Sequence, residues 1–195
     1  MLHGSYARRA CIKIKKMTIL NEILGHDYQV KITRLKKGDI LQRTGELSSK
    51  AFFVKNGLLR SYTIDDKGKV HIFMFAPEGW IVADFESQEF EQPAELFIDA
   101  IEDSEVVILD RKLLTESDLN TIQVKRNVKL LSRRIGILQR RIIMLMSASA
   151  KERYDFFLDA YPELPNRIPQ KMIASYLGIT PQALSTIRGK MARKK

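Results

Sequence analysis

The sequence predicts an α+β chain in three parts: an N-terminal β jelly roll, one long helix and a C-terminal helix-turn-helix. Three observations predict this order. Short β-rich runs from residue 28 to residue 110 show a period of two, which is typical of half-buried strands. Apolar residues between 124 and 145 then recur at helical spacing, and a Gly followed by a Thr-Pro pair divides the last apolar segment into two short helices.

The composition excludes several classes of protein. The chain has 195 residues, 45% of them hydrophobic, which is enough to bury a core. No run of about 18 apolar residues occurs, so we expect no membrane-spanning helix. A single cysteine, Cys11, excludes an intrachain disulfide and a multi-cysteine metal site, and it fits a reducing, cytoplasmic location. Since His3, His26 and His71 lie far apart in the sequence, we expect no metal and no cofactor.

The first 16 residues are basic and contain no acidic residue. We expect a basic tail without structure, or a stretch that precedes the native start, with Met17 as the true first residue. A transit peptide is the alternative on composition alone. Apolar residues after Met17 predict a short amphipathic helix that ends at Gly25.

Residues 17–118 are assigned to the jelly-roll domain. Turn signals such as Lys55-Asn56-Gly57 separate its strands, and an Asn-Gly pair suits a tight hairpin. Many short strands at this spacing predict a sandwich or jelly roll of roughly 80 residues. The predicted strands are residues 51–54, 58–64, 70–75, 96–101 and 106–109.

Residues 119–147 are predicted to form a dimerisation helix. Apolar side chains are spaced alternately four and three residues apart from Val124 onwards. β-branched residues at the a positions with leucine at d favour a parallel two-stranded coiled coil. The alternative is a helix that lies on its own domain, and a second stripe of Leu130, Ile137 and Met144 fits that contact. The predicted dimer seam consists of Val128, Leu131, Ile135, Leu138, Ile142 and Leu145.

Residues 148–195 are predicted to form a helix-turn-helix domain. A capping box at Ser149–Glu152 begins one helix, which the prolines after residue 161 end. Further on, Gly178 suits the left-handed turn that ends a helix. Thr180 is a good N-cap for the next helix, and Pro181 fits its first position. These spacings are those of a helix-turn-helix, and a plain αα-hairpin is the alternative.

The charge distribution indicates a polyanionic partner for the C-terminal part. Residues 121–195 hold 16 Lys and Arg against 4 Asp and Glu, whereas residues 70–110 hold 11 acidic residues and no Lys or Arg. Polar side chains near the start of a recognition helix can reach base edges, and cations can reach phosphates. The candidate DNA-binding residues are Thr180, Gln182, Ser185, Thr186, Arg188, Lys190 and Arg193.

This order of parts resembles the Crp/Fnr family of bacterial transcription regulators, over about residues 17–193. The likeness is closest in residues 168–188, which read IPQKMIASYLGITPQALSTIR and look like the short-tailed members from Bacteroidetes. The resemblance implies a cyclic-nucleotide-binding-like sensor domain coupled to a DNA-binding domain. It further implies a homodimer on an inverted repeat of double-stranded DNA, an unknown small-molecule effector or none, and RNA polymerase as a candidate partner.

The family's cyclic AMP cassette is degenerate in this sequence. Its Gly-Glu pair, whose acid holds the ribose, corresponds to the end of Val82-Ala83-Asp84, so that Asp84 is the candidate replacement for the Glu. Its phosphate-binding Arg corresponds to Ala94, and Glu95 follows. A cyclic phosphate would therefore lie among carboxylates without a charge-assisted partner. We expect no response to cyclic AMP, and an effector that is uncharged or cationic, or none.

The sequence lacks the residues for several other properties of the family. An iron–sulfur cluster needs several cysteines, and His71 fits a strand residue better than a haem ligand. Pro181, Gln182 and Thr186 stand where well-known members have Arg, Glu and Arg, so their operator sequence does not apply. Because the sequence ends seven residues after Arg188, we expect a truncated or absent wing.

Two other classes of function remain open. One is a small-molecule or cyclic-nucleotide sensor without DNA binding. The other is a cupin-like jelly-roll enzyme, which would need clustered histidine and carboxylate ligands. The sequence shows no nucleophile–base constellation and no phosphate-binding Gly-rich loop, so we expect no enzyme.

Overall fold

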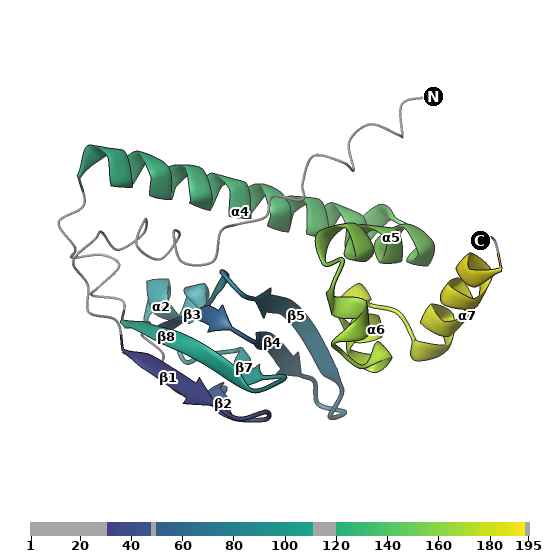
Figure 1. Ribbon diagram of the computed structural model, residues 1–195, viewed down its shortest axis with the longest axis horizontal. Coiled ribbons are helices and arrows are strands. Elements are labelled where there is room, and N and C mark those ends of the chain that lie inside the picture. The colour runs from purple at the N-terminus through teal and green to yellow at the C-terminus, as the bar shows by residue number, and fades with distance from the viewer. Residues whose placement is uncertain (1–30, 48–49, 111–119, 194–195) are drawn as a thin grey trace. The chain divides into compact units, whose positions relative to one another are not determined.

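The structure, a computed structural model, describes residues 31–47, 50–110 and 120–193 (Figure 1). The chain divides between Leu130 and Leu131 into two compact units. The predicted basic tail of residues 1–16 and the predicted short helix after Met17 lie outside the described residues.

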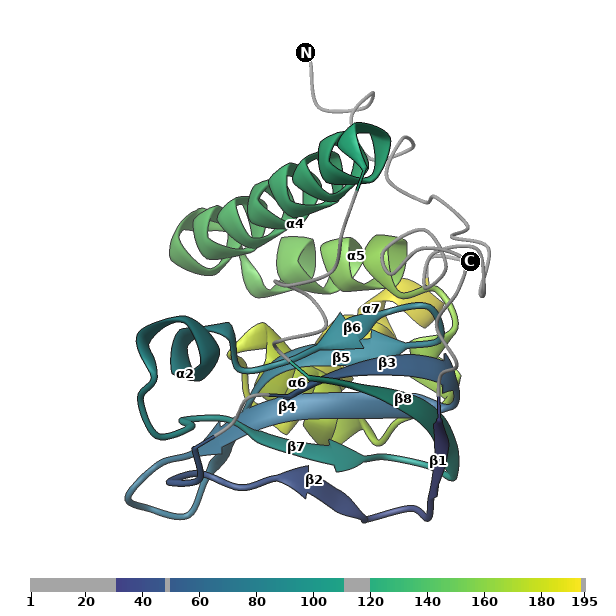
Figure 2. The same ribbon diagram turned by 90° about the vertical axis from the view of Figure 1, so that its left-hand side faces the viewer.

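The first unit contains two four-stranded sheets that face each other (Figure 2). Every strand pair in both sheets is antiparallel. Strands that follow one another in the sequence lie partly in different sheets, as in a jelly roll. The first sheet has the order β1 (Ile32–Leu35), β8 (Ser104–Asp110), β3 (Lys50–Asn56), β6 (Ile81–Val82); the second has the order β2 (Ile40–Gln42), β7 (Phe97–Ala100), β4 (Leu58–Ile64), β5 (Val70–Pro77).

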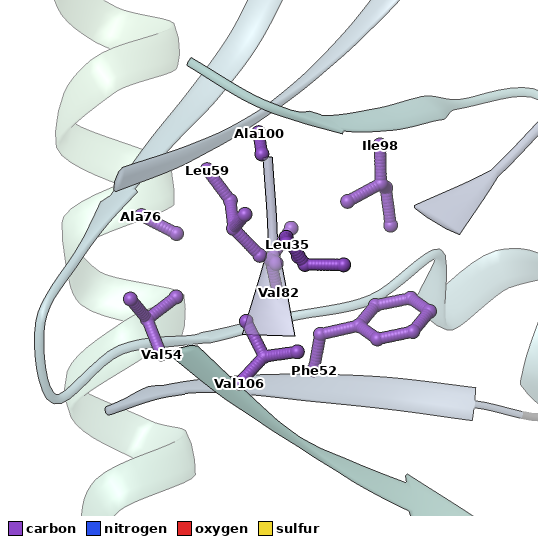
Figure 3. Close-up of a cluster of buried hydrophobic side chains, with 9 residues drawn as sticks. All are labelled: Leu35, Phe52, Val54, Leu59, Ala76, Val82, Ile98, Ala100 and Val106. Carbon is purple, nitrogen blue, oxygen red and sulfur yellow. The ribbon is translucent and has the colours of Figure 1, made fainter. Parts of the chain in front are cut away.

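A cluster of buried apolar side chains fills the space between the two sheets. Figure 3 shows Leu59 and Ile98 of the second sheet facing Phe52, Val54 and Val106 of the first. These five side chains are 0–2% exposed. The alternation of apolar residues along each strand places them on one face, and burial of that face stabilises the sandwich.

The hairpin between β3 and β4 requires glycine at its turn. Gly57 has φ +94°, and a Cβ at this position would overlap the side chain and backbone of Ser104. The Ser104 hydroxyl accepts a hydrogen bond from the Leu58 N–H at 3.1 Å. At the predicted Asn-Gly turn, Ser104 of β8 therefore approaches too closely for any residue with a Cβ.

All five predicted strands are confirmed, and four short elements of the jelly roll lie outside them. These are β1, β2, β6 and the helix α2 (Phe85–Phe90). β2 and β6 have three and two residues, which is too short for a period of two to be recognised. α2 has six residues, and its sequence shows no amphipathic repeat.

The helix α4 (Thr121–Ser147) crosses the division, and the second unit contains three more α-helices. They pack on one another around side chains that are 0–4% exposed, among them Tyr154, Phe157 and Ile173. The predicted capping box is confirmed: the Ser149 hydroxyl accepts from the Glu152 N–H, and the Glu152 carboxylate accepts from the Ser149 N–H. The helices are α5 (Ala150–Ala160), α6 (Gln170–Leu177) and α7 (Pro181–Ala192), with a short 3₁₀ turn, η2 (Leu164–Asn166), before α6.

Candidate nucleic-acid interface and sensor cassette

The turn between α6 and α7 has the geometry that the sequence predicts. Gly178 lies at φ 64°, in the left-handed region, and its N–H bonds the end of α6. The Thr180 hydroxyl caps α7 by accepting from the Ala183 N–H at 3.1 Å, and Pro181 takes the first helical position. This sequence of caps makes the turn compact and fixes where the second helix begins.

The inner faces of α6 and α7 pack closely on each other and on α5. Ala174 is 1% exposed, which allows the helices to approach. Leu177 and Leu184 are fully buried, whereas Ile179 and Ile187 are half-buried. The opposite face of α7 is therefore the one that a partner can reach.

That outer face of α7 is polar and basic. Gln182, Ser185 and Thr186 are exposed near its start, and Lys190 and Arg193 are exposed at its end. The Thr186 hydroxyl donates to the Gln182 carbonyl at 3.0 Å. Within the described residues, the side chains of Gln182 and Ser185 make no hydrogen bond, so their donors and acceptors are available to a partner. Of the other candidate residues, Thr180 is exposed but serves as the cap of α7, and Arg188 is half-buried.

The predicted dimer seam lies on a strongly apolar surface of α4. Five of its six residues are between 40% and 64% exposed in the single chain, and Leu145 is half-buried. Isolated exposed leucines are common, but a continuous row of large aliphatic side chains marks an interaction surface. Of the second stripe, Met144 is 7% exposed whereas Ile137 is 47% exposed, so this stripe is not covered along its whole length. The five exposed seam residues are Val128, Leu131, Ile135, Leu138 and Ile142.

Asp84 is the best-connected residue of the degenerate cassette. It is 3% exposed and caps α2, with Oδ1 accepting from the Ser87 N–H at 3.2 Å. Its Oδ2 accepts from the consecutive N–H groups of Glu95 and Leu96, both at 2.9 Å. The carboxylate therefore joins the segment before α2 to the segment after it, and three backbone donors surround it.

The position that the resemblance aligns with the phosphate-binding Arg is buried. Ala94 is 3% exposed, and its backbone forms two hydrogen bonds of 2.8 Å, to Gly45 and Glu46. Glu95 is exposed. Val82 and Ala83 are buried beside them, and Val82 pairs with Phe52 of β3. The five cassette residues therefore come together in space, and no cation is among them.

A second buried carboxylate in the acidic region is neutralised within the fold. Asp99 of β7 lies opposite Arg60 of β4, and two hydrogen bonds of 2.7 Å join the carboxylate to the guanidinium. The Tyr62 ring covers Arg60, with 4.3 Å from the Arg60 Cζ to the ring centroid. In a bidentate pair of this kind each charge has its counter-charge within the fold.

No metal site is formed by the part of the chain that the structure describes. Within it, no group of three or more His, Cys, Asp and Glu side chains comes together. His71 lies on β5, and its Nε2 is 2.8 Å from Asp65 Oδ2, so it is a partnered strand residue. No helix among the same residues is long and apolar enough to cross a membrane.

Comparisons with known proteins agree with this architecture. Residues 32–117 match the Cyclic nucleotide-binding domain. The chain is 26% identical over 167 residues to the transcriptional activator protein FnrA of Stutzerimonas stutzeri, a match that covers 78% of this chain and 67% of that protein. Its fold is similar to that of TTHA1359, a transcriptional regulator of the CRP/FNR family from Thermus thermophilus, with a TM-score of 0.66, 20% identity, and coverage of 84% of this chain and 87% of that one. The chain thus resembles a transcriptional activator in sequence and a CRP/FNR regulator in fold.

A second solved structure shows how far the similarity of the fold extends. FixK2 from Bradyrhizobium japonicum superposes with a TM-score of 0.72 at 18% identity and covers 85% of each chain. Because this likeness spans sheets and helices alike, it confirms the predicted α+β fold class.

Proposed function

We propose that this Crp/Fnr protein is a homodimeric, cytoplasmic DNA-binding regulator of transcription that works without a cyclic nucleotide. The exposed polar and basic face of α7, presented by a compact helix-turn-helix, is the observation that carries the proposal. A sensor that does not bind DNA would have no use for this face. It would also leave unexplained the excess of 16 Lys and Arg over 4 Asp and Glu in residues 121–195. A regulator of this kind is not an enzyme, and RNA polymerase is its candidate protein partner.

The proposed DNA contacts divide into two classes. Gln182 and Ser185 lie exposed on the first turns of α7, where side chains of a recognition helix reach base edges in the major groove. An amide such as that of Gln182 can bind an adenine through two hydrogen bonds. Lys190 and Arg193 lie at the other end of the helix and are placed for phosphates, whose contacts add affinity without sequence preference.

The seam on α4 supports the proposed homodimer. Its exposed aliphatic side chains would be covered by the same row on a second copy. Two recognition helices held in this way meet successive major grooves about 34 Å apart, so the proposed binding site is an inverted repeat.

The cassette supports independence from cyclic nucleotides. A cyclic phosphate needs a cation or several free N–H donors when it leaves water. Ala94 supplies no cation, and the Asp84 carboxylate already occupies the N–H groups of Glu95 and Leu96. A second anion next to this carboxylate would be repelled, so the proposed effector is uncharged or cationic, or there is none.

We expect no specific binding of cyclic AMP or cyclic GMP. Isothermal titration calorimetry of the full chain should show no saturable heat with either nucleotide at physiological concentrations. Micromolar affinity for either one would contradict the proposal. Substitution of Arg126 or Arg133 of α4, the candidate donors of a missing cation in the dimer, would then locate the source of the affinity.

The two classes of DNA contact should respond differently to mutation. Gln182→Ala should reduce the discrimination between bases by about 1–3 kcal/mol of binding free energy at one base pair per half-site, and so change the preferred sequence. Arg193→Gln should weaken all sequences alike, and it should reduce the slope of log affinity against log salt by about one per lost contact. Selection from random DNA and salt titrations measure these effects.

A matched control for Arg193 is Lys151→Gln, because Lys151 lies on α5 and pairs with Asp155 of the same helix. This variant should bind DNA as the unmodified protein does. An unchanged sequence preference in Gln182→Ala would show that the base-contacting face is placed wrongly. If the DNA affinity of the unmodified protein does not depend on salt, the proposal that it is a DNA-binding regulator is contradicted.

A further inference from the structure

Arg153 of α5 bonds the ends of two other helices at once. Its Nη2 donates to the Leu145 carbonyl at 2.8 Å and its Nε to the Ala148 carbonyl at 3.0 Å, at the C-terminal end of α4. Its Nη1 donates to the carbonyl of Leu177, the last residue of α6, at 3.2 Å. Carbonyls at a helix C-terminus have no partner within the helix and carry its partial negative charge. One guanidinium therefore donates to carbonyls at both helix ends and links them.

Arg141 of α4 makes a second connection to the same end of α6. Its Nη2 donates to the Tyr176 carbonyl at 3.2 Å, and its Cζ lies 4.0 Å from the centroid of the Tyr176 ring. That ring packs against Phe157 and Tyr161, with centroid distances of 5.6 and 5.8 Å. Burial raises the pKa of Tyr161 well above its usual value, so the cluster holds no phenolate and stays an apolar support for α6.

The backbone accounts for the remaining carbonyls at this end of α6. The Gly178 N–H donates to the Ser175 carbonyl at 3.1 Å, and the Ile179 N–H donates to the Ala174 carbonyl at 3.0 Å. The last four carbonyls of α6 thus all have donors, two from the turn and two from Arg141 and Arg153. A Cβ added at Gly178 would lie 3.5 Å from Arg153 Nη1, so the guanidinium also lies against the turn that leads to α7.

We propose that Arg141 and Arg153, together the arginine pair, are positioning residues that set the spacing between DNA half-sites. The proposal rests on the proposed dimer and its DNA binding. The pair fixes the direction of α6 and α7 relative to the C-terminal part of α4, which carries the dimer seam. In the dimer, that direction determines the distance and rotation between the two recognition helices.

The chemistry of arginine is required for this role. A planar guanidinium can donate in three directions to carbonyls of different helices, whereas a lysine ammonium is a point charge that cannot span them. Arg153→Lys therefore keeps the charge and leaves at least one helix end without its donor. Each added base pair rotates a half-site by about 35°, so a loosened connection tolerates spacings that a fixed one rejects.

The test uses full-length protein and a panel of DNA duplexes. Selection with the unmodified protein first identifies the half-site. The panel then carries two inverted copies of it at centre-to-centre separations that differ by one to three base pairs, together with a single half-site. The unmodified protein should bind the duplex with the preferred spacing about tenfold more tightly than a duplex whose spacing differs by two base pairs. Arg140→Lys is the matched control, because Arg140 is exposed on α4 and makes no hydrogen bond within the described residues.

Arg153→Lys should reduce the spacing preference to about threefold or less and should leave the affinity for the single half-site within about twofold. A merely structural role would lower binding to every duplex alike and keep the preference, and either that result or an unchanged preference overturns the proposal. If circular dichroism shows that Arg153→Lys is unfolded, Arg141→Lys decides the matter by the same ratio. Failure of the unmodified protein to select any inverted repeat would instead contradict the proposed function.

Discussion

Replacing Ile135 with aspartate is expected to convert the proposed dimer into monomers. Ile135 lies in the middle of the seam on α4 and is 64% exposed in the single chain. In a dimer its side chain would be buried against the same residue of the second copy, so an aspartate there would place an unpaired charge in a dry interface. The cost is about 3 kcal/mol or more. Light scattering of both proteins at micromolar concentration measures the change.

Ile143→Asp is the matched control for this prediction. Ile143 lies on the same helix, is 56% exposed, and occupies a position outside the heptad seam. It introduces the same charge on the same helix, and it should leave the dimer intact. A monomeric unmodified protein, or an equal shift in both variants, would show that the seam is not the contact. DNA affinity should fall together with dimerisation, because two linked half-site contacts bind more tightly than two separate ones.

Replacing Asp84 with alanine is expected to destabilise the jelly roll by about 3 kcal/mol. The substitution leaves the N–H groups of Ser87, Glu95 and Leu96 without their acceptor, and it also removes the cap of α2. Buried donors that lose a charged partner cost more than the average hydrogen bond contributes. Urea denaturation followed by circular dichroism measures the free energy of unfolding.

Glu95→Ala separates this effect from a simple change of charge. Glu95 is exposed and contributes its backbone N–H, not its side chain, to the bond with Asp84. Its replacement should change the free energy of unfolding by about 0.5 kcal/mol or less. Equal stability of the Asp84→Ala variant and the unmodified protein would mean that the carboxylate is not what joins the two sides of α2.

The elements that were predicted from the sequence are those whose signals are local. Gly178, Thr180 and Pro181 each act within one turn of chain, so the helix-turn-helix could be placed residue by residue. Likewise, the capping box at Ser149 depends on residues three positions apart. The five long strands were found because their alternation continues over four or more residues.

The arrangement around Asp84 and Arg153 could not be predicted in the same way. Both side chains form hydrogen bonds with backbone groups. Almost every residue has the same backbone N–H and carbonyl, so the residue types do not indicate which of these groups will be a partner. The donors to Asp84 Oδ2 are 11 and 12 residues away, and one acceptor of Arg153 is 24 residues away. Only the packing of α2 and of the helices α4 to α6 brings these groups together. The resemblance to the family suggested that Asp84 binds the ribose of a ligand. The structure shows that its carboxylate accepts hydrogen bonds from backbone N–H groups of the same chain.

The central claim, that this protein is a dimeric DNA-binding regulator independent of cyclic nucleotides, is tested most directly by selection from random double-stranded DNA. The selection is run with the unmodified protein, with and without cyclic AMP. We predict enrichment of one inverted repeat with half-sites about one helical turn apart, equally in both conditions. Recovery of no preferred sequence, or enrichment only when cyclic AMP is present, would contradict the account.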